Sequence, residues 1–224
     1  MQIAVLAAGS AAECDALATQ LADVEGVTSV LTAKDEAYSK GLPEAMTPLV
    51  VACQEAGSYS HILAGSNAFG KNLMPRVGAL LDVQPIADIA EIQSEDTFVR
   101  MVYAGNAVST VQSSDPVKLL TVSFTKFDRA AEGAAGSPSV SDAPAATGAV
   151  PASEWLKEEL ASGDRPELTS ADVVVSGGRA LKSGDNFGIL YDLCAPSCPQ
   201  PPDHHSPFPT YGDTRDTASL SPGQ

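Results

Sequence analysis

Residues 60–82, "SHILAGSNAFGKNLMPRVGALLD", decide the fold class of this 224-residue chain. Residues 60–66 are a short apolar run that predicts a buried strand, and residues 70–82 predict a helix. Two similar strand–helix pairs precede this stretch, which completes a β-α-β-α-β-α order. That order predicts an α/β fold with a mostly parallel open sheet, right-handed crossovers and helices on both faces of the sheet.

The two earlier pairs carry recognisable helix signals. A buried strand at residues 3–8 is followed by a helix in which Ser10 is a plausible cap and Cys14 and Leu17 follow at helical spacing. A strand at residues 27–33 then leads to a helix at residues 42–57. Pro43 stands near the start of this second helix, Gly57 is a stop signal, and Pro48 is expected to kink the helix or delay its regular part.

The pattern changes after Pro85. Residues 86–92, 97–113 and 117–124 are strand-like, and residues 103–106, "YAGN", are a hairpin-turn candidate. Residues 129–151 are rich in Ala, Gly, Ser and Pro, which predicts a linker or mobile loop. Residues 153–160 predict a short helix with Ser153 as its cap, and a new strand-turn-helix pattern begins near Arg165.

Composition excludes some classes of partner. The formal net charge is −15, which argues against nucleic acid and anionic membrane surfaces because both require basic patches. No run approaches the length of a membrane span. Cys14 and Cys53 lie in expected helices and are predicted to be reduced core thiols.

Two glycine-rich turns are candidate ligand sites. Residues 65–72, "GSNAFGKN", satisfy G-x-x-x-x-G-K, although Asn72 stands where a phosphate loop has Ser or Thr. The alternative, which we favour, is an ordinary strand-to-helix turn. Residues 173–187, "VVVSGGRALKSGDNF", place Arg179 at the carboxyl end of a strand, where open α/β sheets bind ligands. From spacing alone, an exposed turn with solvated charges remains an equal alternative.

Neither a metal site nor a catalytic constellation is expected. Cys194 and Cys198 form C-x3-C and His204 and His205 follow, but this spacing is not that of a standard zinc site. His61 precedes a buried strand and is expected to be structural. Glu158 and Glu159 are expected to be solvated charges on the short helix.

Several separate blocks, in order, carry a resemblance. They are "SHILAGSNAFGKNLMPRVGALLDVQPIADIAEI", "DTFVRMVYAGNAVSTV" and "DRPELTSADVVVSGGRALKSGDNF". Over about residues 3–193 the chain resembles the alpha subunit of electron-transfer flavoprotein. The resemblance implies that residues 65–72 belong to the N-terminal domain and are not a triphosphate site. Lys71 is then expected to be structural or at the subunit surface.

The resemblance also implies a function. Members of the family are heterodimers of an alpha and a beta subunit, and the heterodimer contains FAD. The heterodimer passes electrons from acyl-CoA and related dehydrogenases to a ubiquinone oxidoreductase, in fatty-acid beta-oxidation and amino-acid breakdown. The protein would be a mitochondrial matrix electron carrier, not a membrane protein and not an enzyme that transforms a substrate. Carried over, Arg179 contacts the flavin cofactor, Gly177 and Gly178 form its turn, and Lys182 and Ser183 are further cofactor-binding residues.

The chain also departs from the family, and the departures set the expected domains. Residues 1–128 would be the N-terminal α/β domain without the family's first strand and helix, and no targeting segment is visible. Residues 129–164 would be the linker with a short helix, and residues 165–193 the first strand-turn-helix of an FAD-binding Rossmann-like domain. Residues 194–224 match nothing in the family and are expected to be an unrelated, disordered tail, as from an altered reading frame.

One cofactor loop cannot supply the contacts that a flavin site needs, so we expect this chain alone to bind FAD weakly or not at all. The alternative function is a truncated, non-flavin-binding module that binds only the beta subunit, or a chain without function. A further alternative is an ATP-hydrolysing P-loop protein, which would lose its activity on Lys71→Ala. A chain that does not fold stably would lack a protease-resistant core over residues 1–128.

Overall fold

The computed structural model describes residues 2–131, 133, 137–146, 153–158, 173–194 and 217–220. It divides the chain into two compact units, residues 1–156 and 157–224. The predicted α/β class with mostly parallel open sheets is confirmed. The domain boundaries predicted from the sequence remain predictions.

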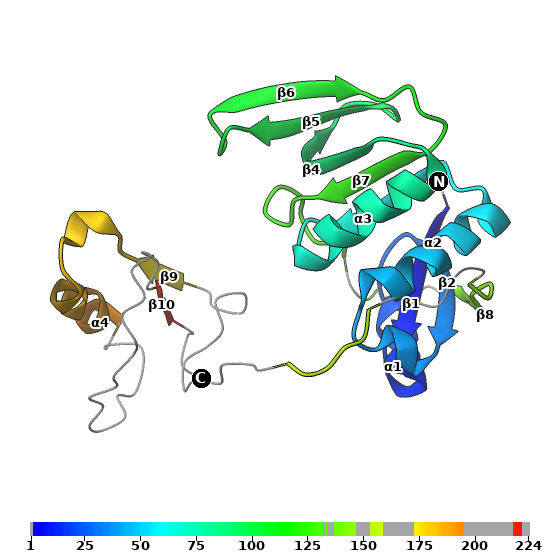
Figure 1. Cartoon of the computed structure of the whole chain (residues 1–224), viewed down its shortest axis with the longest axis horizontal. Helices are drawn as coiled ribbons and strands as arrows, with labels where there is room; N and C mark the ends of the chain where they lie inside the picture. The colour runs from blue at the N-terminus through cyan, green and yellow to red at the C-terminus, as the bar shows by residue number, and fades with distance from the viewer. Residues whose placement is uncertain are drawn as a thin grey trace. The chain divides into compact units, whose positions relative to one another are not determined.

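The first unit alternates strands and helices before it turns to strands alone (Figure 1). Its elements are β1 (Ile3–Gly9), α1 (Ala11–Leu21), β2 (Val27–Lys34), the 3-10 helix η1 (Glu36–Tyr38), α2 (Pro43–Gly57), β3 (His61–Gly65), α3 (Ala68–Leu81), β4 (Pro85–Ile92), β5 (Thr97–Val102), β6 (Ala107–Gln112), β7 (Lys118–Val122) and β8 (Ser139–Asp142).

The sequence signals for the start of α1 and for the start and end of α2 are confirmed. The Ser10 hydroxyl accepts a hydrogen bond from the Glu13 backbone N–H, and the Glu13 carboxylate accepts one from the Ser10 backbone N–H. This reciprocal arrangement is a capping box, which satisfies N–H groups that a helix start leaves unpaired. In α2, Pro43 occupies the first turn and Pro48 lies within the helix, which runs on to Gly57.

The strands form two sheets in this unit. One has the order β1-β2-β8 and is parallel throughout. The other has the order β3-β7-β4-β5-β6, with parallel β3-β7-β4 pairings and antiparallel β4-β5-β6 pairings. The sequence predicted one sheet, but among the described strands β3 pairs with β7 and not with β1 or β2. This pairing joins segments far apart in the sequence, which local patterns do not encode.

The core lies around the middle of α2 and α3. Leu49 of α2, Met74 and Val77 of α3 and Leu119 of β7 are almost fully buried in one cluster. Leu6 of β1 packs against the same cluster, so α2 and α3 serve both sheets. A second, smaller cluster is formed by Ile86, Ile89, Phe98 and Leu120.

Two segments differ from the sequence predictions. The expected linker contains β8, which pairs with β2, and the Ala143 N–H donates to the Thr32 carbonyl oxygen at 2.8 Å. Backbone bonds at the open edge of β2 therefore order a segment that has no apolar periodicity. Residues 153–158, predicted to be helical, are irregular. A helix this short is marginal without tertiary packing, and Leu156 is exposed.

The second unit contains β9 (Val173–Ser176), the 3-10 helices η2 (Arg179–Leu181) and η3 (Gly184–Phe187), α4 (Gly188–Cys194) and β10 (Thr217–Leu220). The predicted strand-turn-helix after Arg165 is thus present, with two 3-10 turns between the strand and the helix. Of the residues 194–224 expected to be a disordered tail, the structure describes Cys194, which ends α4, and β10, which pairs with β9 in antiparallel fashion. The rest of the tail lies outside the described residues.

Candidate functional site

The glycine turn after β9 is a compact chain reversal. β9 ends at Ser176, Gly177 and Gly178 follow, and η2 begins at Arg179. The Leu181 N–H donates to the Gly178 carbonyl oxygen at 2.9 Å, which closes the turn. The turn therefore holds the Arg179 backbone immediately after the carboxyl end of the strand, as the sequence predicted.

The two glycines of this turn have different structural roles. A Cβ on Gly177 would collide with the Leu181 side chain and lie 2.7 Å from Cδ1 of Leu190, so the backbone packs closely at this position. A Cβ on Gly178 would meet no atom within 4 Å. Gly177 is thus a packing glycine, while the backbone at Gly178 faces open space that a ligand can approach.

Lys182 and Ser183 follow directly and shape the next turn. Lys182 is exposed and has a φ of 65°, in the left-handed region. The Ser183 hydroxyl accepts from the Asp185 N–H at 3.3 Å and contacts the Asp185 carboxylate at 3.1 Å. Asn186 Nδ2 donates to the Leu181 carbonyl oxygen at 2.6 Å. Ser183 is therefore the N-cap of η3, a role that the sequence pattern did not indicate.

All five predicted cofactor-binding residues lie within residues 177–183, which span the glycine turn and the start of the turn that follows it. The residue types fit an anionic group, because the basic residues Arg179 and Lys182 follow Gly178 in the chain and the Gly178 backbone faces open space. The Asp185 carboxylate places one negative charge beside Ser183, so the turn is not uniformly basic. The turn is therefore suited to hold part of a phosphate-bearing cofactor.

The other glycine-rich turn, residues 65–72, uses its groups for internal contacts. The Asn67 side chain accepts from the Gly70 N–H at 2.8 Å and so caps α3. A Cβ on Gly70 would strike the Gly65 carbonyl, and the Phe124 ring lies against Gly65. Lys71 is exposed on α3. These contacts favour the ordinary strand-to-helix turn over a phosphate loop.

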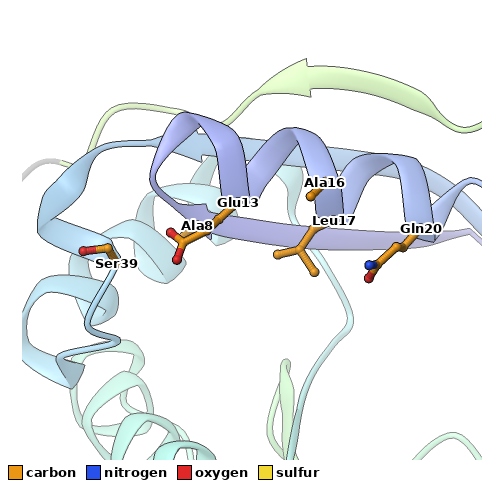
Figure 2. A pocket seen from close by; sticks show the side chains of 6 residues that line it. All are labelled: Ala8, Glu13, Ala16, Leu17, Gln20 and Ser39. Atoms are coloured by element: carbon orange, nitrogen blue, oxygen red, sulfur yellow. The ribbon is translucent and has the colours of Figure 1, made fainter. Parts of the chain in front are cut away.

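The surface of the first unit has two hollows that no sequence motif announced. Figure 2 shows the first, of about 370 Å³, beside α1. Leu17 and Gln20 of α1 line it together with Ala8, and the Glu13 carboxylate at its end is occupied by the capping box. The hollow is mainly apolar and brings no reactive groups together.

The second hollow, of about 390 Å³, lies at the carboxyl end of β2. Lys34, Asp35, Tyr38 and Asp142 line it. Lys34 is paired with Asp15, N to O 2.8 Å, and burial together with the Asp35 charge raises the pKa of Tyr38. Its place at the end of parallel strands is the one sequence-level signal that could have located it.

The histidine and cysteines within the first unit are structural. His61 Nε2 lies 2.7 Å from the Glu95 carbonyl oxygen, and its ring meets Phe98 edge-on. Cys14 and Cys53 are buried free thiols, as predicted. Among the described residues, no three His, Cys, Asp or Glu side chains are grouped to hold a metal. Cys198, His204 and His205 lie outside the described residues.

No helix in the described part of the chain is both long and apolar enough to cross a membrane.

Comparison with known proteins gives consistent matches. A sequence model described as "Electron transfer flavoprotein domain" matches residues 1–147. The chain is 48% identical over 192 residues to a "Probable electron transfer flavoprotein subunit alpha, mitochondrial" of Caenorhabditis elegans, covering 86% of this chain and 57% of that protein. It is 51% identical over 193 residues to an "Electron transfer flavoprotein subunit alpha" of Pseudomonas aeruginosa, covering 85% and 60%.

A mitochondrial alpha subunit of Dictyostelium discoideum is 40% identical over 205 residues, which cover 85% of this chain and 56% of that protein. The chain thus spans somewhat more than half the length of the curated relatives that it matches.

Proposed function

Because the chain belongs to the electron transfer flavoprotein family, where it matches alpha subunits, we propose that it is the alpha-subunit component of an FAD-containing electron carrier. The family name assigns an electron-transfer role and not the transformation of a substrate. The observation that carries the proposal is the turn at Gly177 and Gly178, which leaves an open backbone position beside Arg179 in a chain of this family.

We assign the cofactor contact to this turn. Arg179 and Lys182 would bind the anionic part of FAD and place positive charge near it, and Gly178 would allow close backbone approach. Gly177 and Ser183 would hold the turn in shape through packing and capping. When bound, FAD would supply the one- or two-electron relay, while the protein positions it and tunes its potential.

The partners follow from the family. We propose that the chain pairs with a beta subunit, accepts electrons from acyl-CoA and related dehydrogenases, and delivers them to a ubiquinone oxidoreductase in fatty-acid beta-oxidation and amino-acid breakdown. The relatives from Caenorhabditis elegans and Dictyostelium discoideum are named mitochondrial, which supports a mitochondrial site and, as the finer proposal, the matrix. The Pseudomonas aeruginosa relative shows that bacteria also hold such subunits.

The test is co-expression of the full chain with a beta subunit, followed by measurement of bound flavin by absorbance. We expect a complex that contains FAD, and we expect Arg179→Ala to weaken FAD binding at least tenfold with less effect from Arg179→Lys. Arg129→Ala, which removes an exposed arginine outside the turn, is the matched control. Equal FAD affinity in the Arg179→Ala and Arg129→Ala complexes would contradict the assignment.

The chain by itself is expected to bind FAD weakly, because Gly178, Lys182 and Gly184 are all exposed while cofactor sites bury most of the ligand. Fluorescence titration of the isolated chain with FAD checks this expectation, and tight stoichiometric binding would refute it. A complex with the beta subunit that carries no flavin would support the alternative function, a module that only binds the partner.

A further inference from the structure

The β5–β6 hairpin ends the five-stranded sheet at an unprotected edge. Figure 1 shows β6 beside β5, and among the described strands β6 has no second neighbour. The sequence of β6, "AVSTVQ", has no proline and no charged residue, and its register with β5 has no bulge. Proteins usually protect free strand edges with such features, because an open edge is a template for another strand.

The hydrogen-bond alternation shows which groups this edge offers. In an antiparallel pair of strands, residue pairs that exchange backbone hydrogen bonds alternate with pairs that do not. The Ser113 N–H donates to the Asp96 carbonyl oxygen, so counting by twos along the register from this pair makes Arg100 with Ser109 a bonded pair as well. On β6 the N–H groups of Val108 and Thr110 then point away from β5. They form a row of outward donors that has no partner strand in the described part of the chain.

One face of the hairpin is apolar and exposed. Met101 and Val108 are cross-strand neighbours, and the two residues are 40% and 66% exposed. Tyr103 at the hairpin turn is 82% exposed, and the Asn106 side chain donates to its carbonyl oxygen at 2.9 Å. A well-ordered turn therefore presents large apolar side chains that the described residues leave uncovered.

The opposite face carries an arginine, Arg100, whose buried Nε atom has no acceptor among the described residues. Arg100 also belongs to neither of the ion pairs found in that part of the chain. Such a buried donor is costly unless something accepts from it. Arg100 stands in a row with Ile89 on β4 and Ser109 on β6. A residue of an added strand would take the next position in this row, beyond Ser109, whose side chain is small.

We propose that the β6 edge receives a β-strand of the beta subunit, which extends the five-stranded sheet, covers Met101 and Val108, and brings a carboxylate to Arg100. The choice of occupant rests on the proposed function, since an alpha subunit acts with a partner chain. It also rests on charge complementarity, because the chain has a net charge of −15 yet the described residues offer the Nε of Arg100 no acceptor. Main-chain bonds would provide affinity and the Arg100 contact would fix the register.

The decisive variant is Thr110→Pro, which removes one outward donor without removing a bond to β5. Proline is tolerated on an edge strand when its nitrogen faces solvent. We expect Thr110→Pro to reduce the beta subunit that co-purifies with the full chain at least tenfold, while circular dichroism shows a fold and melting temperature close to wild type. Thr110→Val, which keeps the donor and the strand, is the matched control and should retain the partner.

A second variant tests the charge contact. Arg100→Gln should weaken the complex, and Arg100→Lys should restore part of the affinity. If the wild-type chain forms a flavin-containing complex with the beta subunit and Thr110→Pro forms the same complex equally well, this inference is overturned and the proposed function stands. Failure of the wild-type chain to bind a beta subunit would overturn both. A self-associated chain that Thr110→Pro converts to a monomer would assign the edge to a second copy and refute the partner named here.

Discussion

Gly78 lies in the last turn of α3, against the segment that connects α3 to β4, and its replacement by alanine is expected to destabilise the protein. In an exposed helix, Gly→Ala would stabilise by about 1 kcal/mol. Here the new Cβ would stand 2.8 Å from the Val83 carbonyl oxygen, 3.1 Å from Pro85 Cδ and 3.2 Å from Leu119 Cδ2. The Val83 N–H also donates to the Gly78 carbonyl oxygen at 3.0 Å, so this backbone cannot move away freely.

Overpacking of this kind costs about 1–3 kcal/mol, and three close contacts with a tied backbone point to the upper part of that range. After the helix gain is subtracted, Gly78→Ala should lower the free energy of unfolding by about 1–2 kcal/mol. Urea denaturation followed by circular dichroism measures the change. Asn72→Ala, at an exposed position in the same helix, should instead stabilise slightly. A Gly78→Ala protein at least as stable as wild type would refute the packing argument.

Two further predictions concern titrating groups. Hydrogen bonds from Gln112, Ser94 and Thr97 hold the pKa of the Asp96 carboxyl at about 2. This depressed pKa contributes stability above the unfolded-state value of about 3.9, and the contribution is lost as the pH falls toward 2. Between about pH 5 and about pH 2, the melting temperature should therefore fall further for the wild-type protein than for Asp96→Asn. Parallel curves of melting temperature against pH for the two proteins would contradict the role of Asp96. Burial raises the pKa of the Cys53 thiol, so alkylation mapped by mass spectrometry should be slow in the native protein and fast in urea. Equal rates in both conditions would be inconsistent with that burial.

The elements predicted most accurately are those that local chemistry determines. Ser10 and Glu13 cap a helix through contacts three residues apart, and the hairpin turn at Tyr103 and Asn106 closes on itself. Each depends on neighbours that a reader of the sequence sees together. The α/β class followed from the same local information, because alternating strand and helix patterns admit few layered arrangements.

Non-local contacts account for what the sequence did not reveal. β3 pairs with β7 across more than fifty residues, and β8 lies within a segment whose composition indicates a loop. The turn of the candidate site was predicted correctly in position. The difference between Gly177, which packs against Leu181 and Leu190, and Gly178, which packs against nothing, depends on where later side chains return.

The arrangement of two sheets around one pair of helices has a consequence for how the first unit opens. No hydrogen-bonded ladder among the described strands joins β1-β2-β8 to β3-β7-β4-β5-β6. Side-chain packing at α2 and α3 and the ion pair between Arg76 and Glu44 connect them. Loosening that helix pair would therefore separate the unit into halves whose amides exchange with solvent at different rates. Cooperative unfolding of the first unit would then depend on the helices more than on either sheet.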